Sequence, residues 1–199
     1  MKNFELNYQD LQQFNDLFKK CLDLTIKTQF SYINNFSNDL KTAILQDRSI
    51  FFCGNGGSFA DSQHIVGELV VRLKKNRVPF NCLALGCNQS VTTAISNDFD
   101  YEKIFSRELE AYGREKDILV CLSTSGKSKN IISVLQQAQS IGISSWLFTG
   151  NNKNLNNNLS KNIYIQSNQT EIIQETYMHI HHYVCKELEN YFYEYKKDF

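Results

Sequence analysis

The chain has 199 residues, of which 42% are hydrophobic, which is enough for one domain with a substantial core. Its 21 basic residues balance its 21 acidic ones, so the overall charge gives no indication of a nucleic-acid partner. No apolar run approaches the roughly 20 residues that a membrane-spanning helix needs, and the first residues do not form a signal segment. The six cysteines include no Cys-x-x-Cys pair. We therefore expect a cytoplasmic protein with reduced thiols and no membrane partner.

The first 48 residues show the spacing of amphipathic helices. Apolar residues recur every three or four positions in two stretches with a break between them: Leu11, Phe14, Phe18 and Leu22, then Ile33, Phe36, Leu40 and Ile44. Neither stretch contains glycine or proline. We predict two helices in residues 1–48, which pack either in a bundle with another subunit or on the chain's own sheet.

From residue 49 to 199, short apolar runs alternate with longer segments of helical character. The runs are Ile50–Cys53, Cys82–Leu85, Ile118–Leu122, Trp146–Phe148 and Ile163–Ile165. Continuous apolarity is typical of strands covered on both faces, and strands separated by helices form parallel sheets. The pattern predicts an α/β fold, a three-layer αβα sandwich with a central parallel sheet, and a last helix over 170–192. The Asn-rich segment 151–162 fits either a frayed helix or a long loop.

Two loops that follow predicted strands are rich in glycine and hydroxyl groups. They are Gly54–Ser58 and Ser123–Ser128, and a helix is expected after each. Unpaired backbone N–H groups and the helix dipole favour an anion there. A Walker A loop is excluded because Cys121 occupies the position where that motif needs its first glycine. A dinucleotide-binding fingerprint is excluded because Phe59 occupies the position of its third glycine. Either loop alone is equally typical of a simple strand–helix turn, but the pair favours a sugar phosphate.

Histidine and carboxylate side chains indicate a possible metal or acid–base site. His64 and Glu68 are four residues apart and share a helix face, although a surface His–Glu pair is a common alternative. In the last helix, ideal periodicity places His181 within about 20° of Gln174 and His182 about 80° away, which slightly favours His181. Imidazole, carboxylate and amide groups would suit zinc or a similar divalent ion.

Several segments, in this order, resemble phosphoheptose isomerases of the sugar isomerase (SIS) domain group: Gly54–Ser58, Asp61–Arg72, Ser96–Phe99, Phe105–Arg107, Gly113–Asp117, Ser123–Gly126 and Ile173–Glu175. The resemblance implies a flavodoxin-like SIS fold. It implies an isomerase that converts D-sedoheptulose 7-phosphate to D-glycero-D-manno-heptose 7-phosphate through an enediol, for heptose in bacterial surface glycans such as lipopolysaccharide or capsule. It also implies a zinc-binding homotetramer whose N-terminal helices are bundled and whose active sites lie at subunit interfaces.

The resemblance also assigns residues. The implied metal ligands are His64, Glu68, Gln174 and His182, since the family's eight-residue separation from Gln174 selects His182 over His181. Glu68 and His182 are our candidate acid–base pair. The implied substrate-binding residues are Asn55, Gly56, Gly57, Ser58, Glu68, Arg72, Asn97, Asp98, Ser123, Thr124, Ser125, Ser128 and Gln174.

The chain departs from the family pattern at a few positions. Tyr177 replaces a usual histidine, Ile172 a frequent arginine and Phe59 a frequently smaller residue, and Glu171 is also unusual. The alternatives are a non-catalytic SIS protein that binds a replication initiator and a module that senses a sugar phosphate. The presence of the four implied metal ligands favours the isomerase.

Overall fold

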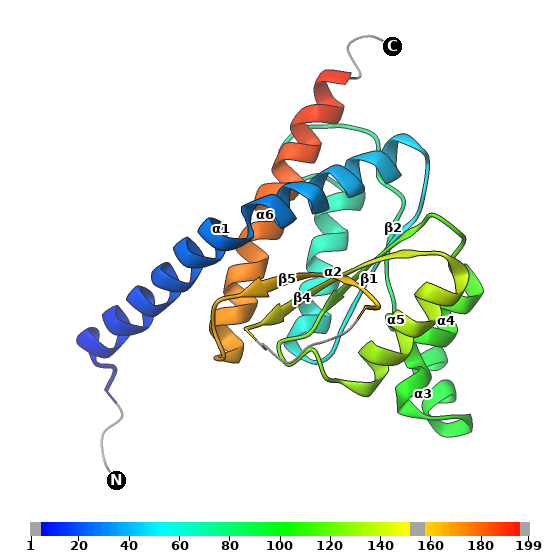
Figure 1. The fold of residues 1–199 in the computed structure, drawn as a ribbon, viewed down its shortest axis with the longest axis horizontal. Coiled ribbons are helices and arrows are strands. Elements are labelled where there is room, and N and C mark those ends of the chain that lie inside the picture. Colours follow the sequence, from blue (N-terminus) through cyan, green and yellow to red (C-terminus); the bar gives the residue numbers. More distant parts are fainter. Residues whose placement is uncertain (1–4, 152–157, 196–199) are drawn as a thin grey trace.

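A five-stranded sheet forms the centre of the computed structural model, which describes residues 5–151 and 158–195 (Figure 1). The strands are β1 (Ile50–Gly54), β2 (Cys82–Ala84), β3 (Ile118–Leu122), β4 (Ser144–Gly150) and β5 (Lys161–Ile165). Their order is β2-β1-β3-β4-β5, and every neighbouring pair is parallel. All five predicted strands are confirmed. Part of the Asn-rich segment, 152–157, lies outside the described residues.

Helices cover both faces of the sheet, which confirms the predicted αβα sandwich. They are α1 (Tyr8–Leu45), α2 (Gly57–Val70), α3 (Gln89–Asp98), the 3₁₀ turn η1 (Tyr101–Lys103), α4 (Ile104–Tyr112), α5 (Lys129–Ile141) and α6 (Thr170–Tyr195). Side chains of α1, α2 and α6 share one hydrophobic cluster, and those of α3, α4 and α5 share the other. Along β1, Phe52 faces the first cluster and Phe51 the second, so this strand is apolar throughout.

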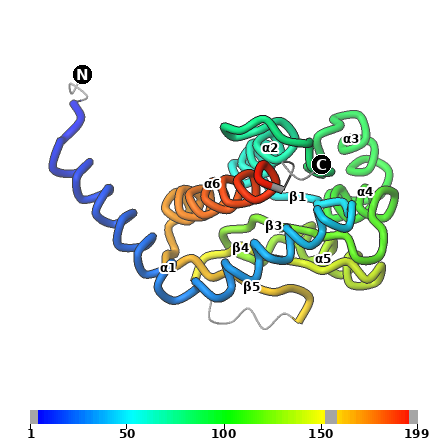
Figure 2. Tube along the Cα trace, turned by 90° about the horizontal axis from the view of Figure 1, so that it is seen from above, coloured from blue at the N-terminus to red at the C-terminus, as the bar shows by residue number. Residues whose placement is uncertain are grey.

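The prediction of two N-terminal helices is wrong, because α1 is one continuous helix of 38 residues. The backbone between the two apolar stretches contains neither glycine nor proline, and the Thr28 hydroxyl donates to the Leu24 carbonyl within the helix. The break in the pattern marks a change of surroundings instead. Phe36 is fully buried against the sheet, whereas Leu11 is 61% and Phe14 41% exposed. The first half of α1 projects from the rest of the molecule (Figure 2).

From Thr25 onward, α1 covers the free edge of β5 and the residue that follows this strand. The Gln29 side-chain oxygen accepts a hydrogen bond from the Tyr164 backbone N–H at 3.3 Å, and the Thr25 hydroxyl accepts one from the Gln166 N–H at 3.0 Å. These bonds satisfy donors that an edge strand otherwise leaves open.

The strand order reverses direction between β1 and β3, since β2 pairs with one side of β1 and β3 with the other. In open α/β sheets, ligands bind outside the carboxyl ends of the strands at such a switch point. The loops Gly54–Ser58 and Ser123–Ser128 both begin there. Among the described residues, the structure contains no helix with the length and apolarity of a membrane span.

Candidate active site

Helices α2 and α6 lie side by side and run in the same direction (Figures 1 and 2). The number of residues in the sequence that separates two contacting side chains is nearly the same along the whole pair. It is 119 residues between Ser58 and Tyr177 and 118 between His64 and His182. The parallel pair therefore extends from the first loop to a cluster of histidine and carboxylate side chains.

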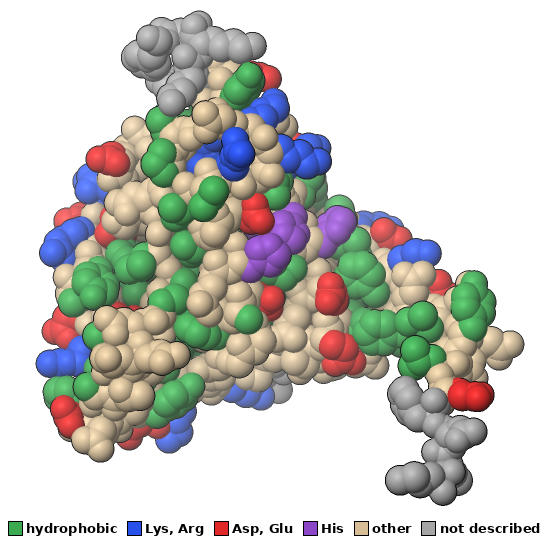
Figure 3. Space-filling model, turned by 180° about the vertical axis from the view of Figure 1, so that it is seen from behind, with side chains coloured by type: hydrophobic (Ala, Val, Ile, Leu, Met, Phe, Trp, Pro, Cys, Tyr) green, Lys and Arg blue, Asp and Glu red, His purple; other side chains and the backbone are tan. Residues whose placement is uncertain are grey.

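This cluster contains His64, Glu68 and His182, whose ligand atoms all lie within 4.8 Å of one another. The His64 Nε2 atom is 3.4 Å from Glu68 Oε1 and 3.4 Å from His182 Nε2. In a tetrahedral zinc site with bonds of about 2.0–2.1 Å, ligand atoms lie roughly 3.3 Å apart. The donor set and its spacing therefore fit a divalent metal ion. Figure 3 shows histidine side chains gathered on one face of the molecule beside acidic ones.

His181 lies apart from this cluster, in the hydrophobic core. Its side chain is 1% exposed, with its ring 4.3 Å from that of Phe148 and 5.6 Å from that of Phe36. Its Nδ1 atom lies 2.7 Å from the Tyr177 carbonyl oxygen, which requires the proton on Nδ1, and Nε2 has no hydrogen-bond partner within the part of the chain that the structure describes. Burial lowers the pKa of His181 to about 4. Ideal helical spacing slightly favoured His181 as a ligand, but the structure places His182 beside His64.

Four side chains meet at the first turn of α2. The hydroxyl oxygen of Tyr177 is 2.9 Å from Ser58 Oγ and 2.9 Å from Asp61 Oδ2, and the Gln174 Nε2 atom is 3.4 Å from Ser58 Oγ. Burial raises the pKa of the Asp61 carboxyl, while the hydrogen bond from Tyr177 lowers it to a smaller extent. Gln174 was predicted to bind both metal and substrate, and its described contacts are with the loop rather than with the three-residue cluster.

Glycines allow the first loop to pass close to α6. Gly56 has a φ of +55°, in the left-handed region that favours glycine. A Cβ atom added to Gly57 would lie 2.5 Å from Gln174 Nε2, so only glycine leaves this amide in place. As the first residue of α2, Gly57 has a backbone N–H without an acceptor inside the helix.

The second loop folds on itself through its hydroxyl groups. Ser123 Oγ accepts a hydrogen bond from the Gly126 N–H at 3.1 Å, and Ser125 Oγ accepts one from the Lys127 N–H at 3.2 Å. Ser128 is the N-cap residue of α5, and its side chain does not cap the helix. Three of the predicted phosphate-binding serines thus surround one helix N-terminus.

A pair of amides joins the first loop to the first turn of α5. Asn55 and Asn130 exchange two hydrogen bonds of 2.9 and 2.8 Å, and the Tyr101 hydroxyl donates to Asn55 Oδ1 at 3.0 Å. The Thr124 carbonyl accepts from the Gly150 N–H at 3.1 Å, which ties the second loop to the end of β4. A cavity of about 200 Å³, lined by Asn55 and Tyr101 among others, opens beside this pair.

Three predicted substrate residues lie on the surface without a described contact to either loop. Asn97 and Asp98 are exposed at the end of α3, where the Asn97 amide donates to Asp98 Oδ1 at 2.8 Å. Arg72 is exposed in the segment after α2. The buried Glu189 anchors that segment by accepting three backbone N–H bonds, from residues 73–75, at 2.7 to 2.8 Å.

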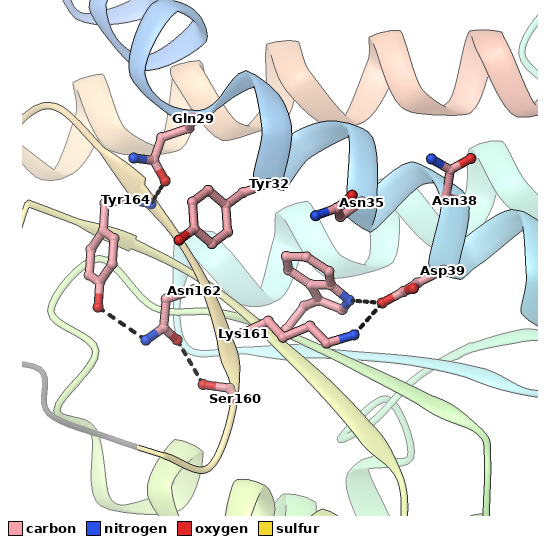
Figure 4. A pocket seen from close by; sticks show the side chains of 10 residues that line it. Gln29, Tyr32, Asn35, Asn38, Asp39, Ser160, Lys161, Asn162 and Tyr164 are labelled. Atoms are coloured by element: carbon pink, nitrogen blue, oxygen red, sulfur yellow. Dashed lines mark hydrogen bonds and ion pairs between the residues drawn. The ribbon is translucent and has the colours of Figure 1, made fainter.

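A larger cavity, of about 540 Å³, lies elsewhere, between α1 and β5 (Figure 4). At its base, Asp39 Oδ2 accepts hydrogen bonds from the Trp146 indole N–H at 3.0 Å and from the Lys161 ammonium group at 2.7 Å. None of the predicted site residues lines it.

Sequence reasoning missed Asp61, Tyr101 and Asn130, and it treated Tyr177 only as a departure from a pattern. Asn130 and Tyr101 reach Asn55 from 75 and 46 residues away, so no local spacing identified them. Tyr177 falls one turn after Gln174 on α6, and this helical spacing was the available signal.

Comparisons with known proteins agree with this geometry. The family model of the SIS domain matches residues 13–149. The phosphoheptose isomerase of Akkermansia muciniphila is 44% identical over 145 residues, which cover 72% of this chain and 77% of that protein. The enzyme of the same name from Clostridium acetobutylicum is 41% identical over 139 residues, covering 69% and 71%.

Two solved structures are also similar. The phosphoheptose isomerase from Neisseria gonorrhoeae superposes with a TM-score of 0.84 at 25% identity, covering 92% of this chain and 98% of that one. For the structure of a phosphoheptose isomerase from Francisella tularensis, the TM-score is 0.80 at 26% identity, with coverage of 91% and 98%.

Proposed function

Because the chain belongs to the phosphoheptose isomerase family of SIS-domain proteins, we propose that it is an aldose–ketose isomerase that converts D-sedoheptulose 7-phosphate to D-glycero-D-manno-heptose 7-phosphate. The observation that carries the proposal is the parallel pair of α2 and α6. It places the His64–Glu68–His182 cluster a few helical turns along α2 from the first loop, and the hydroxyl-rich second loop begins at the same edge of the sheet as the first. A substrate with a phosphate at one end and a carbonyl at the other suits this arrangement.

The reaction moves hydrogen between two neighbouring carbons. A base takes a proton from C1 of the ketose while O2 gains a proton, which gives the enediol. A proton then leaves O1 and another is delivered to C2, which gives the aldose. Glu68 and His182 are the acid–base pair in this proposal, since positioned groups of these types typically contribute about 10²- to 10⁴-fold.

We further propose that His64, Glu68 and His182 hold zinc or a similar divalent ion; Gln174, the fourth ligand implied by the resemblance, would have to leave its contact with Ser58 to join them. The ligand-atom separations of 3.4 Å support this assignment. Such an ion, when bound, would supply a Lewis acid for the oxygen atoms of the substrate. Glu68 then has two candidate roles, as base and as ligand, and coordination would lower its basicity.

The two loops bind the phosphate in this proposal. The backbone N–H groups at the start of α2, beside Ser58, and of α5 supply donors, as do the hydroxyls of Ser123, Ser125 and Ser128. Thr124, Asn55 and the loop glycines complete the set. Binding energy gained at the phosphate orients the distant reacting carbons.

The exposed apolar half of α1 supports a homotetramer in which these arms bundle. Leu11 and Phe14 are exposed in the single chain, and Leu17 is 49% exposed. Surface residues such as Arg72, Asn97 and Asp98 would then reach an active site at a subunit interface. We place the enzyme in the cytoplasm, where its product would enter the heptose of bacterial surface glycans.

The decisive experiment is incubation of the purified protein with sedoheptulose 7-phosphate, with and without chelator and added zinc. The variant Glu68→Gln should still bind substrate but turn over at least about a hundredfold more slowly. Glu110→Gln, an exposed glutamate on α4, is the matched control and should retain full activity. Metal-replete protein that binds the sugar phosphate without isomerising it would indicate a non-catalytic SIS protein instead.

A further inference from the structure

The phenol of Tyr177 is buried between two polar groups of another helix. Its side chain is 0% exposed, and its oxygen lies 2.9 Å from both Ser58 Oγ and Asp61 Oδ2. A phenylalanine ring would fill nearly the same volume. The hydroxyl therefore contributes the two hydrogen bonds rather than packing.

These contacts form a directed chain of hydrogen bonds. A phenol has one proton, and an ionised carboxylate only accepts, so with Asp61 ionised Tyr177 donates to Asp61. The Ser58 hydroxyl then donates to Tyr177, and its oxygen faces the Gln174 amide nitrogen, 3.4 Å away. The order is Gln174, Ser58, Tyr177 and Asp61, which fixes the rotation of the Ser58 hydroxyl.

Ser58 occupies the position at which this restraint matters. It is buried in the first turn of α2, next to Gly57, where the backbone N–H groups have no acceptor inside the helix. A Ser58 side chain that rotates freely must be ordered again whenever an anion binds there, and that ordering opposes binding.

We propose that Tyr177 is a positioning residue for phosphate: through Ser58 it holds the first turn of α2 in the conformation that binds the phosphate group of the substrate. The inference rests on the proposed function for the identity of the substrate, but it applies to any phosphate bound at this turn. Tyr177 does not touch the reacting carbons in this assignment, so its effect belongs to binding rather than to turnover.

The test is a double-mutant cycle with Tyr177→Phe and Ser58→Ala, with inorganic phosphate and sedoheptulose 7-phosphate as probes. Calorimetry should show that Tyr177→Phe weakens phosphate binding roughly tenfold, about the effect of one lost hydrogen bond. KM should rise by a similar factor while kcat changes less than about twofold. In the Ser58→Ala background, the same substitution should have almost no further effect.

Three further variants separate positioning from folding. Tyr112→Phe removes an exposed phenol from α4 and should bind phosphate normally. Asp61→Asn keeps an acceptor for the phenol and should also bind normally, whereas Asp61→Ala should weaken binding. If Tyr177→Phe does not fold, this Asp61 pair still tests the chain of hydrogen bonds.

Several results would overturn the inference. They are an unchanged phosphate affinity in Tyr177→Phe, an equal loss of affinity from Tyr177→Phe with Ser58 present and with Ser58→Ala, a decrease in kcat without a change in KM, or no phosphate binding by the parent protein. Phosphate binding is measured without turnover. A parent protein that binds phosphate but does not isomerise the sugar therefore refutes the proposed function and leaves the cycle interpretable.

Discussion

The Nε2 atoms of His64 and His182 lie 3.4 Å apart, although 118 residues separate them in the chain. His64 is on α2, the first helix after the sheet begins, and His182 is in the middle of the last helix. The sheet brings the two together because α2 and α6 pack on the same face, where they share one hydrophobic cluster. The imidazole pair is therefore a direct product of the topology.

Replacement of His182 should weaken zinc binding more than replacement of a neighbouring histidine. His182→Gln removes one of three clustered ligands, and we expect zinc affinity to fall at least about tenfold. The control is His179→Gln, on the same helix but exposed and outside the cluster. Competition with a chromophoric chelator measures both variants, and equal affinities would remove the cluster as a metal site.

Substitution of two glycines of α2 by alanine should have different effects, one on activity and the other on stability. In Gly57→Ala, the new methyl group must displace the Gln174 amide, which a Cβ would approach to 2.5 Å. We expect kcat/KM to fall roughly tenfold with little change in stability. In Gly67→Ala, no described atom other than those of its chain neighbours and its own helix backbone lies within 4 Å of the new Cβ, so helix stability should rise by up to about 1 kcal/mol and activity should stay constant. Steady-state kinetics and thermal unfolding of both variants check this contrast.

The buried His181 should make the fold sensitive to mild acid. Its folded pKa of about 4 lies below the ordinary value of 6.5, so the unfolded chain binds more protons between these pH values. The free energy of unfolding should fall as the pH decreases from 6.5 to about 4, by at most roughly 3 kcal/mol from this residue.

Urea unfolding of metal-free protein at pH 7 and pH 4.5 measures this loss. His181→Leu should lose less stability between the two pH values than the parent protein does. His179→Gln should behave like the parent, because His179 is exposed. An equal pH dependence in all three proteins would show that His181 does not remain neutral in the folded state.

A charge on the projecting part of α1 should break the proposed tetramer. Phe14→Asp places a carboxylate on the apolar side of α1, and burial of an unpaired charge in a subunit interface is costly. Light scattering should show a mass well below four times the 23.1 kDa of one chain. Gln13→Asp adds the same charge at the neighbouring exposed position and should leave the mass unchanged. A parent protein with the mass of one chain would refute the tetramer.

The sequence predicted the sheet well because its strands are covered on both faces. Continuous apolar runs such as Ile118–Leu122 are explicit in the sequence. The positions of the two glycine- and hydroxyl-rich loops were also predictable, since these loops follow strands and precede helices. Helix α1 was divided incorrectly because apolar spacing reports burial, and its burial changes midway while its backbone continues.

The details of the site depended on packing that local spacing does not contain. An ideal helical wheel slightly favoured His181 over His182, because it contains no information on which side of α6 faces Phe148 and which faces His64. The network of Asp61 and Tyr177 likewise exists only because α2 and α6 are neighbours. A pairing across more than 100 residues requires the three-dimensional fold or a known relative.

Contacting residues on α6 and on α2 or the segment after it are always separated by nearly the same number of residues, and this limits where insertions and deletions can occur in the sequence. Ser58 meets Tyr177, His64 meets His182, and Glu189 holds Leu73, all at separations of 116 to 119 residues. One residue inserted within either helix would turn every later side chain by about 100°. The contacts on one side of the insertion would then be lost together. Insertions and deletions should therefore be tolerated in the surface loops between these helices far better than within either helix.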